Sequence, residues 1–235
     1  MPTYPTTPYS RSSSGPIVLE PSSEAATYGL FALAMLVTVI GVFLGIANAT
    51  VLLTSGMMTM FLIAELALVF TSQWWMRSSP LNILLFIAFP FLSGLTITPY
   101  ILMVLAGYVN GGAILANALI ATVGVAGSAA ILALVIQVDL SGIGRTLLYG
   151  LIGLLVLGIM QIFIPSFRTG GGELLISGLG IVIFAGFTAF DLQRIKMMGR
   201  AGVNPFMLAL SLYLDIFNLF LFLLRFMMVL SGRRR

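Results

Sequence analysis

Residues 205–230 read PFMLALSLYLDIFNLFLFLLRFMMVL, an apolar stretch that contains one carboxylate, Asp215. An α-helix needs about 20 mainly apolar residues to cross the hydrocarbon core of a bilayer. The stretch therefore predicts a membrane-spanning helix. At about 1.5 Å per residue, Asp215 lies about 15 Å along this helix from Pro205, close to the middle of the membrane.

The rest of the chain is similarly apolar. The protein has 235 residues, of which 60% are hydrophobic and 8% are charged, whereas a soluble domain has about 25% charged residues. Lipid offers no hydrogen bonds to exposed backbone groups, so long apolar segments cross it as helices. We therefore expect an all-α integral membrane protein.

Glycine, proline, asparagine and serine separate the apolar segments and define seven expected spans. These spans cover residues 28–47, 51–75, 81–105, 112–138, 146–164, 174–193 and 205–230. Only residues 48–50 separate the first two spans, so we expect a tight helical hairpin there. Residues 1–25 are rich in Pro, Ser and Thr and predict a disordered tail. A single membrane domain of residues 26–231 and a basic tail of residues 232–235 are expected to follow.

The composition excludes several kinds of chemistry. The chain has no Cys and no His, which rules out disulfides, thiolate metal sites and histidine-based zinc, haem or triad sites. The sequence shows no nucleophile–base pair and no phosphate-binding loop, so we expect that the protein is not an enzyme. We interpret the net charge of +4 as a signal of topology and lipid contact rather than of nucleic-acid binding.

Basic residues near the span ends predict the orientation in the membrane. One side holds Arg11, Arg77, Arg145, Arg194, Lys196 and Arg200, and the other holds Arg168 and the Arg233–Arg235 triplet. Because Lys and Arg in short loops favour the cytoplasmic side, we expect a cytoplasmic N-terminus, against the pull of the C-terminal arginines. Trp74 and Trp75 are expected in an interfacial aromatic belt. The short loops and the lack of a eukaryotic targeting signal favour a bacterial inner membrane.

Two aspartates lie within apolar segments, Asp191 near the end of the sixth span and Asp215 inside the last. A carboxylate at membrane depth costs about 2.5–3.5 kcal/mol on insertion scales, so such groups usually face the bundle interior and mark an ion or proton pathway. Ser211 and Asn218 share the helix face of Asp215, as expected for a helix that lines an ion pathway. The alternatives are a local ion pair of Asp191 with Arg194 and a structural hydrogen-bonding role for Asp215.

Glu65 is a third acid inside a predicted span. It could line a pore and bind a cation or carry a proton, or it could simply pair with a hydroxyl or amide of a neighbouring helix. Arg77 is interpreted either as a charge that snorkels to the membrane surface or as a countercharge for Asp191. Arg225 is expected to snorkel as well.

Short motifs around these residues resemble those of a known family. Residues 190–193 read FDLQ and residues 212–220 read LYLDIFNLF, and their aspartates are 24 positions apart. Residues 223–226 (LLRF) and 93–96 (SGLT) extend the pattern. Together these motifs resemble the Bax inhibitor-1 (transmembrane Bax inhibitor motif) family over about residues 27–231, and the short loops look like those of bacterial members.

The resemblance implies a last helix at the centre of the other six and a pH-sensitive calcium leak. It implies that Asp191 and Asp215 form a di-aspartyl pH sensor and gate, with Arg77 as the countercharge of Asp191. Glu65 matches an acidic position of the second span. The three acids are then candidate calcium ligands, with calcium as a permeant or weakly bound ion and no tightly bound cofactor. Membrane lipids, calcium ions and protons are the expected partners.

Two carboxylates that lie close together in a medium of low dielectric do not both ionise easily, so they share a proton and titrate together. A shared proton would tie the sixth span to the seventh, and a change in the number of protons would shift a closed–open equilibrium. The sign of the pH response stays open at this point, because gain and loss of a proton can each break the bond.

Two other functions fit the same residues. The first is a non-conducting membrane regulator that binds other membrane proteins, such as the membrane protease to which some bacterial members of the family are linked. In that case residues 1–25 could provide the contact. The second is a proton-coupled transporter that uses the same three acids.

Overall fold

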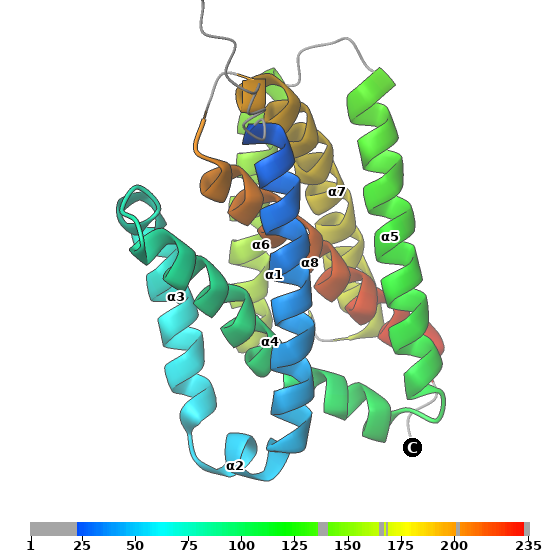
Figure 1. The fold of residues 1–235 in the computed structure, drawn as a ribbon. Helices are drawn as coiled ribbons and strands as arrows, with labels where there is room; N and C mark the ends of the chain where they lie inside the picture. The colour runs from blue at the N-terminus through cyan, green and yellow to red at the C-terminus, as the bar shows by residue number, and fades with distance from the viewer. Residues whose placement is uncertain (1–22, 136–140, 165–166, 168, 201–202, 233–235) are drawn as a thin grey trace, which may run out of the picture.

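The computed structural model describes residues 23–135, 141–164, 167, 169–200 and 203–232, and the elements in these ranges are α-helices (Figure 1). The helices are α1 (Ser23–Ala47), α2 (Ala49–Thr54), α3 (Met57–Trp75), α4 (Leu81–Gly107), α5 (Gly111–Val135), α6 (Ser141–Phe163), α7 (Gly170–Arg200) and α8 (Pro205–Ser231). Among the described helices, the seven other than α2 are long and apolar enough to cross a membrane. The prediction of an all-α membrane protein with seven spans is therefore confirmed. The two predicted tails fall mostly on residues 1–22 and 233–235, which lie outside the described residues.

The second predicted span is wrong in one respect, because residues 51–75 do not form one helix. The short helix α2 ends at Thr54, and α3 begins only at Met57. Between them Gly56 has a φ of 70°, a left-handed conformation that glycine adopts at little cost because it has no Cβ. The expected tight hairpin after α1 is instead a small helical connection.

Helix α7 is longer at both ends than predicted. It begins at Gly170 and so takes in the three glycines that were expected to form a loop. Glu173 lies in its first turn, where a carboxylate interacts favourably with the positive end of the helix dipole. At the other end the helix continues past Gln193, so that Asp191 lies well inside a helix.

The start of α8 is set by local chemistry. The side chain of Asn204 accepts a hydrogen bond from the backbone N–H of Phe206 at 2.9 Å, and Pro205 occupies the first helical position, where no backbone donor is needed. The Asn204 amide also donates to the carbonyl of Met76 at 2.8 Å. This contact fixes the start of α8 against the end of α3.

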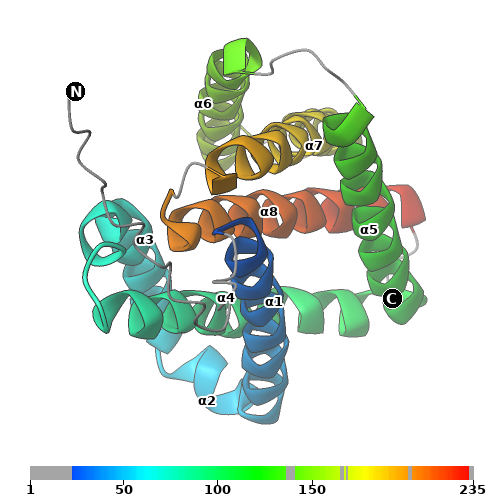
Figure 2. The same cartoon turned by 45° about the horizontal axis from the view of Figure 1, so that its top comes forward.

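Helix α8 occupies the centre of the bundle and is the most buried of the seven spans. Figure 2 shows α8 crossing the middle of the molecule, with α7 on one side and α4 on the other. It packs against α7, α5 and α1, while α6 packs on the outer side of α7 and α3 on α4. The bundle has two ends, called below the Asn204 end, where α8 begins, and the Arg225 end.

Helices α1 and α4 approach closely through glycines. A Cβ atom added to Gly94 of α4 would collide with the carbonyl oxygen of Thr38, and one added to Gly41 of α1 would lie 2.5 Å from the carbonyl oxygen of Phe91. Small residues let membrane helices approach until their backbones touch. This contact holds α4 in the position from which its hydroxyl groups face α3.

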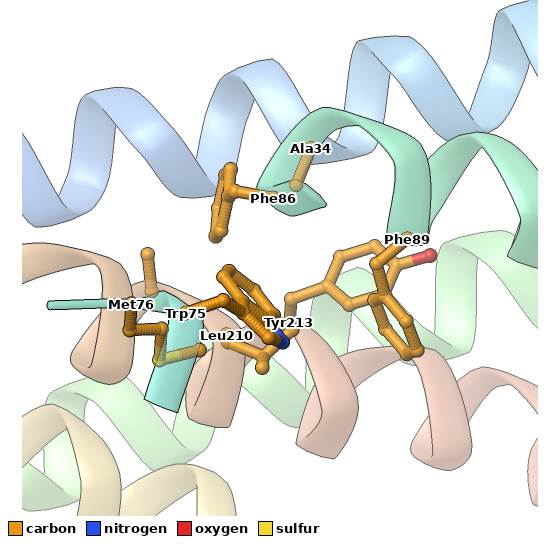
Figure 3. Packing of buried hydrophobic residues seen from close by; sticks show 8 residues of the cluster. Ala34, Trp75, Met76, Phe86, Phe89, Leu210 and Tyr213 are labelled. Atoms are coloured by element: carbon orange, nitrogen blue, oxygen red, sulfur yellow. The ribbon is translucent and has the colours of Figure 1, made fainter. Parts of the chain in front are cut away.

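An aromatic cluster fills the Asn204 end of the bundle (Figure 3). It contains Trp75, whose side-chain N–H donates to the carbonyl of Leu68 at 3.0 Å, and Phe89, whose ring lies edge-on to Tyr213 at 5.8 Å. Trp75 is 4% exposed whereas Trp74 is 78% exposed. The interfacial position therefore fits Trp74, but it is wrong for Trp75, which is part of the core.

Candidate functional site

Asp191 of α7 and Asp215 of α8 lie together in the interior of the bundle. The two residues are only 3% and 7% exposed, respectively. Their carboxyl groups are close enough to act as charged and hydrogen-bonding neighbours of each other. The Oδ2 atom of each is buried and receives no hydrogen bond from the other described residues. One proton held between the two carboxyl groups would supply the missing donor, since only a protonated carboxyl group can donate.

Two further side chains contact Asp191. The Ser211 side chain of α8 lies beside its carboxyl group, and Nη1 of Arg194 lies 3.7 Å from its Oδ1 atom. The Arg194 side chain is 31% exposed, so the charge of the guanidinium group is partly screened by its surroundings. Asp191 therefore has both the local ion pair and the contact with Asp215 that were predicted as alternatives.

Of the two interpretations of Arg77, its position fits a charge that snorkels to the surface rather than a countercharge of Asp191. It is exposed in the turn after α3, and among the described residues the ion-pair partner of Asp191 is Arg194. The physical reason is that the buried Met76 next to it is held by Asn204, whereas Arg194 is one helical turn from Asp191 and reaches it directly.

The polar face of α8 divides in two. Ser211 contacts Asp191 and lines a cavity of about 230 Å³ at the Asn204 end, which Ser72, Gln73 and Arg194 also line. Asn218 donates from its amide nitrogen to the carbonyl of Leu214 at 2.7 Å and lines a separate cavity at the Arg225 end.

Glu65 lies apart from the aspartates and is held by hydroxyl groups. It accepts hydrogen bonds from Ser93 at 2.5 Å and from Thr96 at 2.9 Å. Ser93 also contacts the hydroxyl group of Tyr213, which in turn lies 2.8 Å from the hydroxyl group of Thr38. This chain of hydroxyl contacts joins α3, α4, α8 and α1.

A calcium site built from all three acids is therefore wrong for this structure. Within the described residues, no three Asp, Glu, His or Cys side chains gather where they could hold a metal ion. Calcium takes six to eight oxygen ligands, and Glu65 contributes its oxygens to α4 rather than to the site of Asp191 and Asp215.

Sequence reasoning missed Tyr213 and Thr38 in the chain of hydroxyl contacts. Tyr213 stands two residues before Asp215, so it points to a different side of α8. A buried tyrosine usually finds a hydrogen-bond partner, and this rule was the signal that could have been used. The partners themselves lie on other helices and required the structure.

Arg225 is also not a snorkelling charge. Its Nε donates to Glu173 of α7, and its Nη2 donates to Oε1 of Gln161 of α6 at 2.7 Å. Gln161 donates in turn to Glu173 at 3.4 Å. These three residues connect α6, α7 and α8 at the Arg225 end of the bundle.

The fold and the buried carboxyl groups define a seven-helix integral membrane protein with two aspartates paired between its last two helices. The family model described as "Inhibitor of apoptosis-promoting Bax1" matches residues 22–233. The chain belongs to this Bax inhibitor-1-like family.

Relatives of the chain are bacterial. The uncharacterized protein Cj0236c of Campylobacter jejuni is 31% identical over 209 residues, which cover 88% of each chain. A Helicobacter pylori protein is 32% identical over 210 residues, which cover 88% of this chain and 86% of the relative. The Escherichia coli inner membrane protein YbhL is 30% identical over 185 residues, which cover 74% of each chain.

Proposed function

We propose that this protein is a cation leak pathway of the bacterial inner membrane, with calcium as its permeant ion, and that a proton shared by Asp191 and Asp215 gates it. The observation that carries the proposal is the pair of buried Oδ2 atoms that receive no hydrogen bond from the other described residues. Buried polar groups are nearly always hydrogen-bonded. Two buried carboxyl oxygens without a donor, one on each member of the pair, thus form a site for a proton.

The number of protons on the pair controls the bond between α7 and α8. With one proton, the protonated carboxyl group donates to the ionised one, and the two helices are tied together. With no proton, two negative charges face each other, and only Asp191 has a cation, Arg194, beside it. With two protons, the charge-assisted bond becomes a weaker neutral one. The closed state is therefore most stable when the pair holds one proton.

The proposed orientation puts the Asn204 end in the cytoplasm. The basic residues near the helix ends that meet there are Arg77, Arg145, Arg194 and Lys196. The pair is then near the cytoplasmic face, with Arg194 between the pair and the surface. Protons and cations of the cytoplasm have a short route to it through the cavity lined by Ser211.

Calcium flux into dye-loaded liposomes tests the proposal. Wild type should leak with a profile that depends on pH, and Asp191→Asn or Asp215→Asn should flatten that profile. Glu24→Gln is the matched control, because it removes a carboxylate near the start of α1 that is not among the charged or hydrogen-bonding neighbours of the pair. Liposomes that stay tight at every pH would reject the leak and favour the alternative of a non-conducting membrane regulator. Saturable uptake that depends on a proton gradient would instead favour a transporter.

A further inference from the structure

A cavity with several polar lining residues lies at the Arg225 end, apart from the aspartate pair. Its volume is about 530 Å³, which leaves room for several water molecules, since one water takes about 30 Å³ in the liquid. Its polar lining residues are Tyr100, Tyr108, Glu173, Asn218 and Arg225. Its volume and these polar partners suit the cavity to hold water.

We propose that this cavity is a hydrated vestibule for inorganic cations, in which Glu173 is the carboxylate that receives the cation and Arg225 is a tethered countercharge that the cation displaces. The inference rests on the proposed cation pathway and adds its outer site. It concerns residues that play no part in the proton-sharing pair.

The exposure of the ion pair makes such an exchange feasible. The side chains of Arg225 and Glu173 are 30% and 20% exposed, respectively. A fully buried ion pair is costly to break because each charge is left without water, whereas a partly hydrated pair contributes little net stability. A cation that enters the vestibule can therefore compete with the guanidinium group for Glu173.

Gln161 provides a position for the displaced arginine. Its Oε1 atom already accepts a hydrogen bond from Nη2 of Arg225 at 2.7 Å, while the Nε of Arg225 makes the contact with Glu173. Loss of the second contact leaves the first in place. Arg225 would then stay at the wall of the vestibule while Glu173 holds the cation.

The floor of the vestibule approaches the aspartate pair along α8. Asn218 lines the cavity and is three residues beyond Asp215, about 4.5 Å along the helix axis. The cavity at the Asn204 end includes Ser211, four residues before Asp215, about 6 Å along the axis. On α8, the turns around Asp215 separate the two cavities. Arg225 lies ten residues beyond Asp215, about 15 Å along the helix axis, so a cation held at the outer site reaches the gate by passing Asn218.

The absence of cysteine from the chain permits a test that needs no ion flux. The variant Asn218→Cys places a thiol at the floor of the vestibule. The rate at which this thiol is modified is measured with two small reagents, a cationic and an anionic methanethiosulfonate. Val182→Cys, at a position that is 70% exposed on the outer surface of α7, is the control, and it should react slowly with both reagents in the membrane.

Charge variants then show whether Glu173 and Arg225 set the charge of the vestibule. Arg225 is seven residues beyond position 218, about 10 Å along the helix axis, and a unit charge at about 10 Å in water changes such a rate by about twofold. Arg225→Gln should speed the cationic reagent and slow the anionic one by about this factor, and Glu173→Gln should do the reverse. Calcium should slow the cationic reagent more in Arg225→Gln than in the parent, because Glu173 has then lost its arginine. A double variant, Glu173→Arg with Arg225→Glu, keeps an ion pair and should restore the parental rates.

The proposal is overturned if the thiol of Asn218→Cys reacts with neither reagent, or if the ratio of the two rates is the same in both single variants and the parent. If the labelling rates change as expected but liposomes with the protein show no calcium flux, the proposed leak is wrong and the proposed vestibule stands. If calcium flux is observed but the ratio of the cationic to the anionic labelling rate is the same in the charge variants and the parent, only the proposed vestibule is wrong.

Discussion

Asp191→Asn gives the sharpest prediction about the gate. The amide of asparagine can donate to the carboxyl group of Asp215 whether that group is ionised or protonated, so the bond between α7 and α8 no longer needs a shared proton. In wild type a change in proton number removes a hydrogen bond that involves a charged group, worth roughly 1.5–3 kcal/mol. At 1.4 kcal/mol per factor of ten, this corresponds to roughly a tenfold to hundredfold change in the ratio of closed to open protein.

The assay is calcium flux into dye-loaded liposomes between about pH 5 and 8, a range that begins above the ordinary pKa of an exposed aspartate, about 3.9. The variant should leak at the lowest wild-type rate throughout the range, while wild type should vary by roughly tenfold or more. Asp215→Asn should behave in the same way, since either side chain can be the fixed donor. A variant that keeps the wild-type dependence on pH, or that leaks strongly at every pH, would refute the reasoning.

Three other predictions follow from the packing and the contacts. Gly94→Ala should lower the melting temperature of the purified protein by overpacking of the contact with α1, at a cost of roughly 1–3 kcal/mol, whereas Gly124→Ala, with no atom within 4 Å of its added Cβ, should not destabilise the fold. Tyr213→Phe should lower the stability by roughly 0.5–1.5 kcal/mol for each lost hydroxyl contact, and an unchanged melting temperature would contradict the network described above. Arg194→Gln should shift the pH profile of calcium flux because it removes the ion pair of Asp191, whereas Arg77→Gln should not, and the opposite outcome would restore Arg77 as the countercharge.

The spans of the protein were predictable because length and apolar composition alone decide whether a helix can cross lipid. The break between α2 and α3 was not predicted, because Gly56 is one glycine among 25 and only its left-handed conformation marks it. The early start of α7 was missed for a related reason. A run of glycines usually indicates a loop, but here the glycines form the first turn of a helix.

The site was predictable where an acidic residue lies within an apolar segment, because such a residue is expected to be buried in the bundle. Asp191 and Asp215 stand out because almost all their neighbours in the chain are apolar. The partners of Glu65 and Arg225 have no such signal in the sequence, since Ser93 and Gln161 lie on other helices. Helix packing brings these side chains together, and no spacing along the chain encodes it.

Infrared difference spectroscopy on the purified protein detects the shared proton itself, because a protonated carboxyl group absorbs at a different frequency from an ionised one. At the pH of least leak, the account predicts one protonated carboxyl group that belongs to the pair, and both Asp191→Asn and Asp215→Asn should abolish its band while Glu24→Gln keeps it. A spectrum in which neither aspartate variant removes a protonated carboxyl band would contradict the shared proton and the gate built on it.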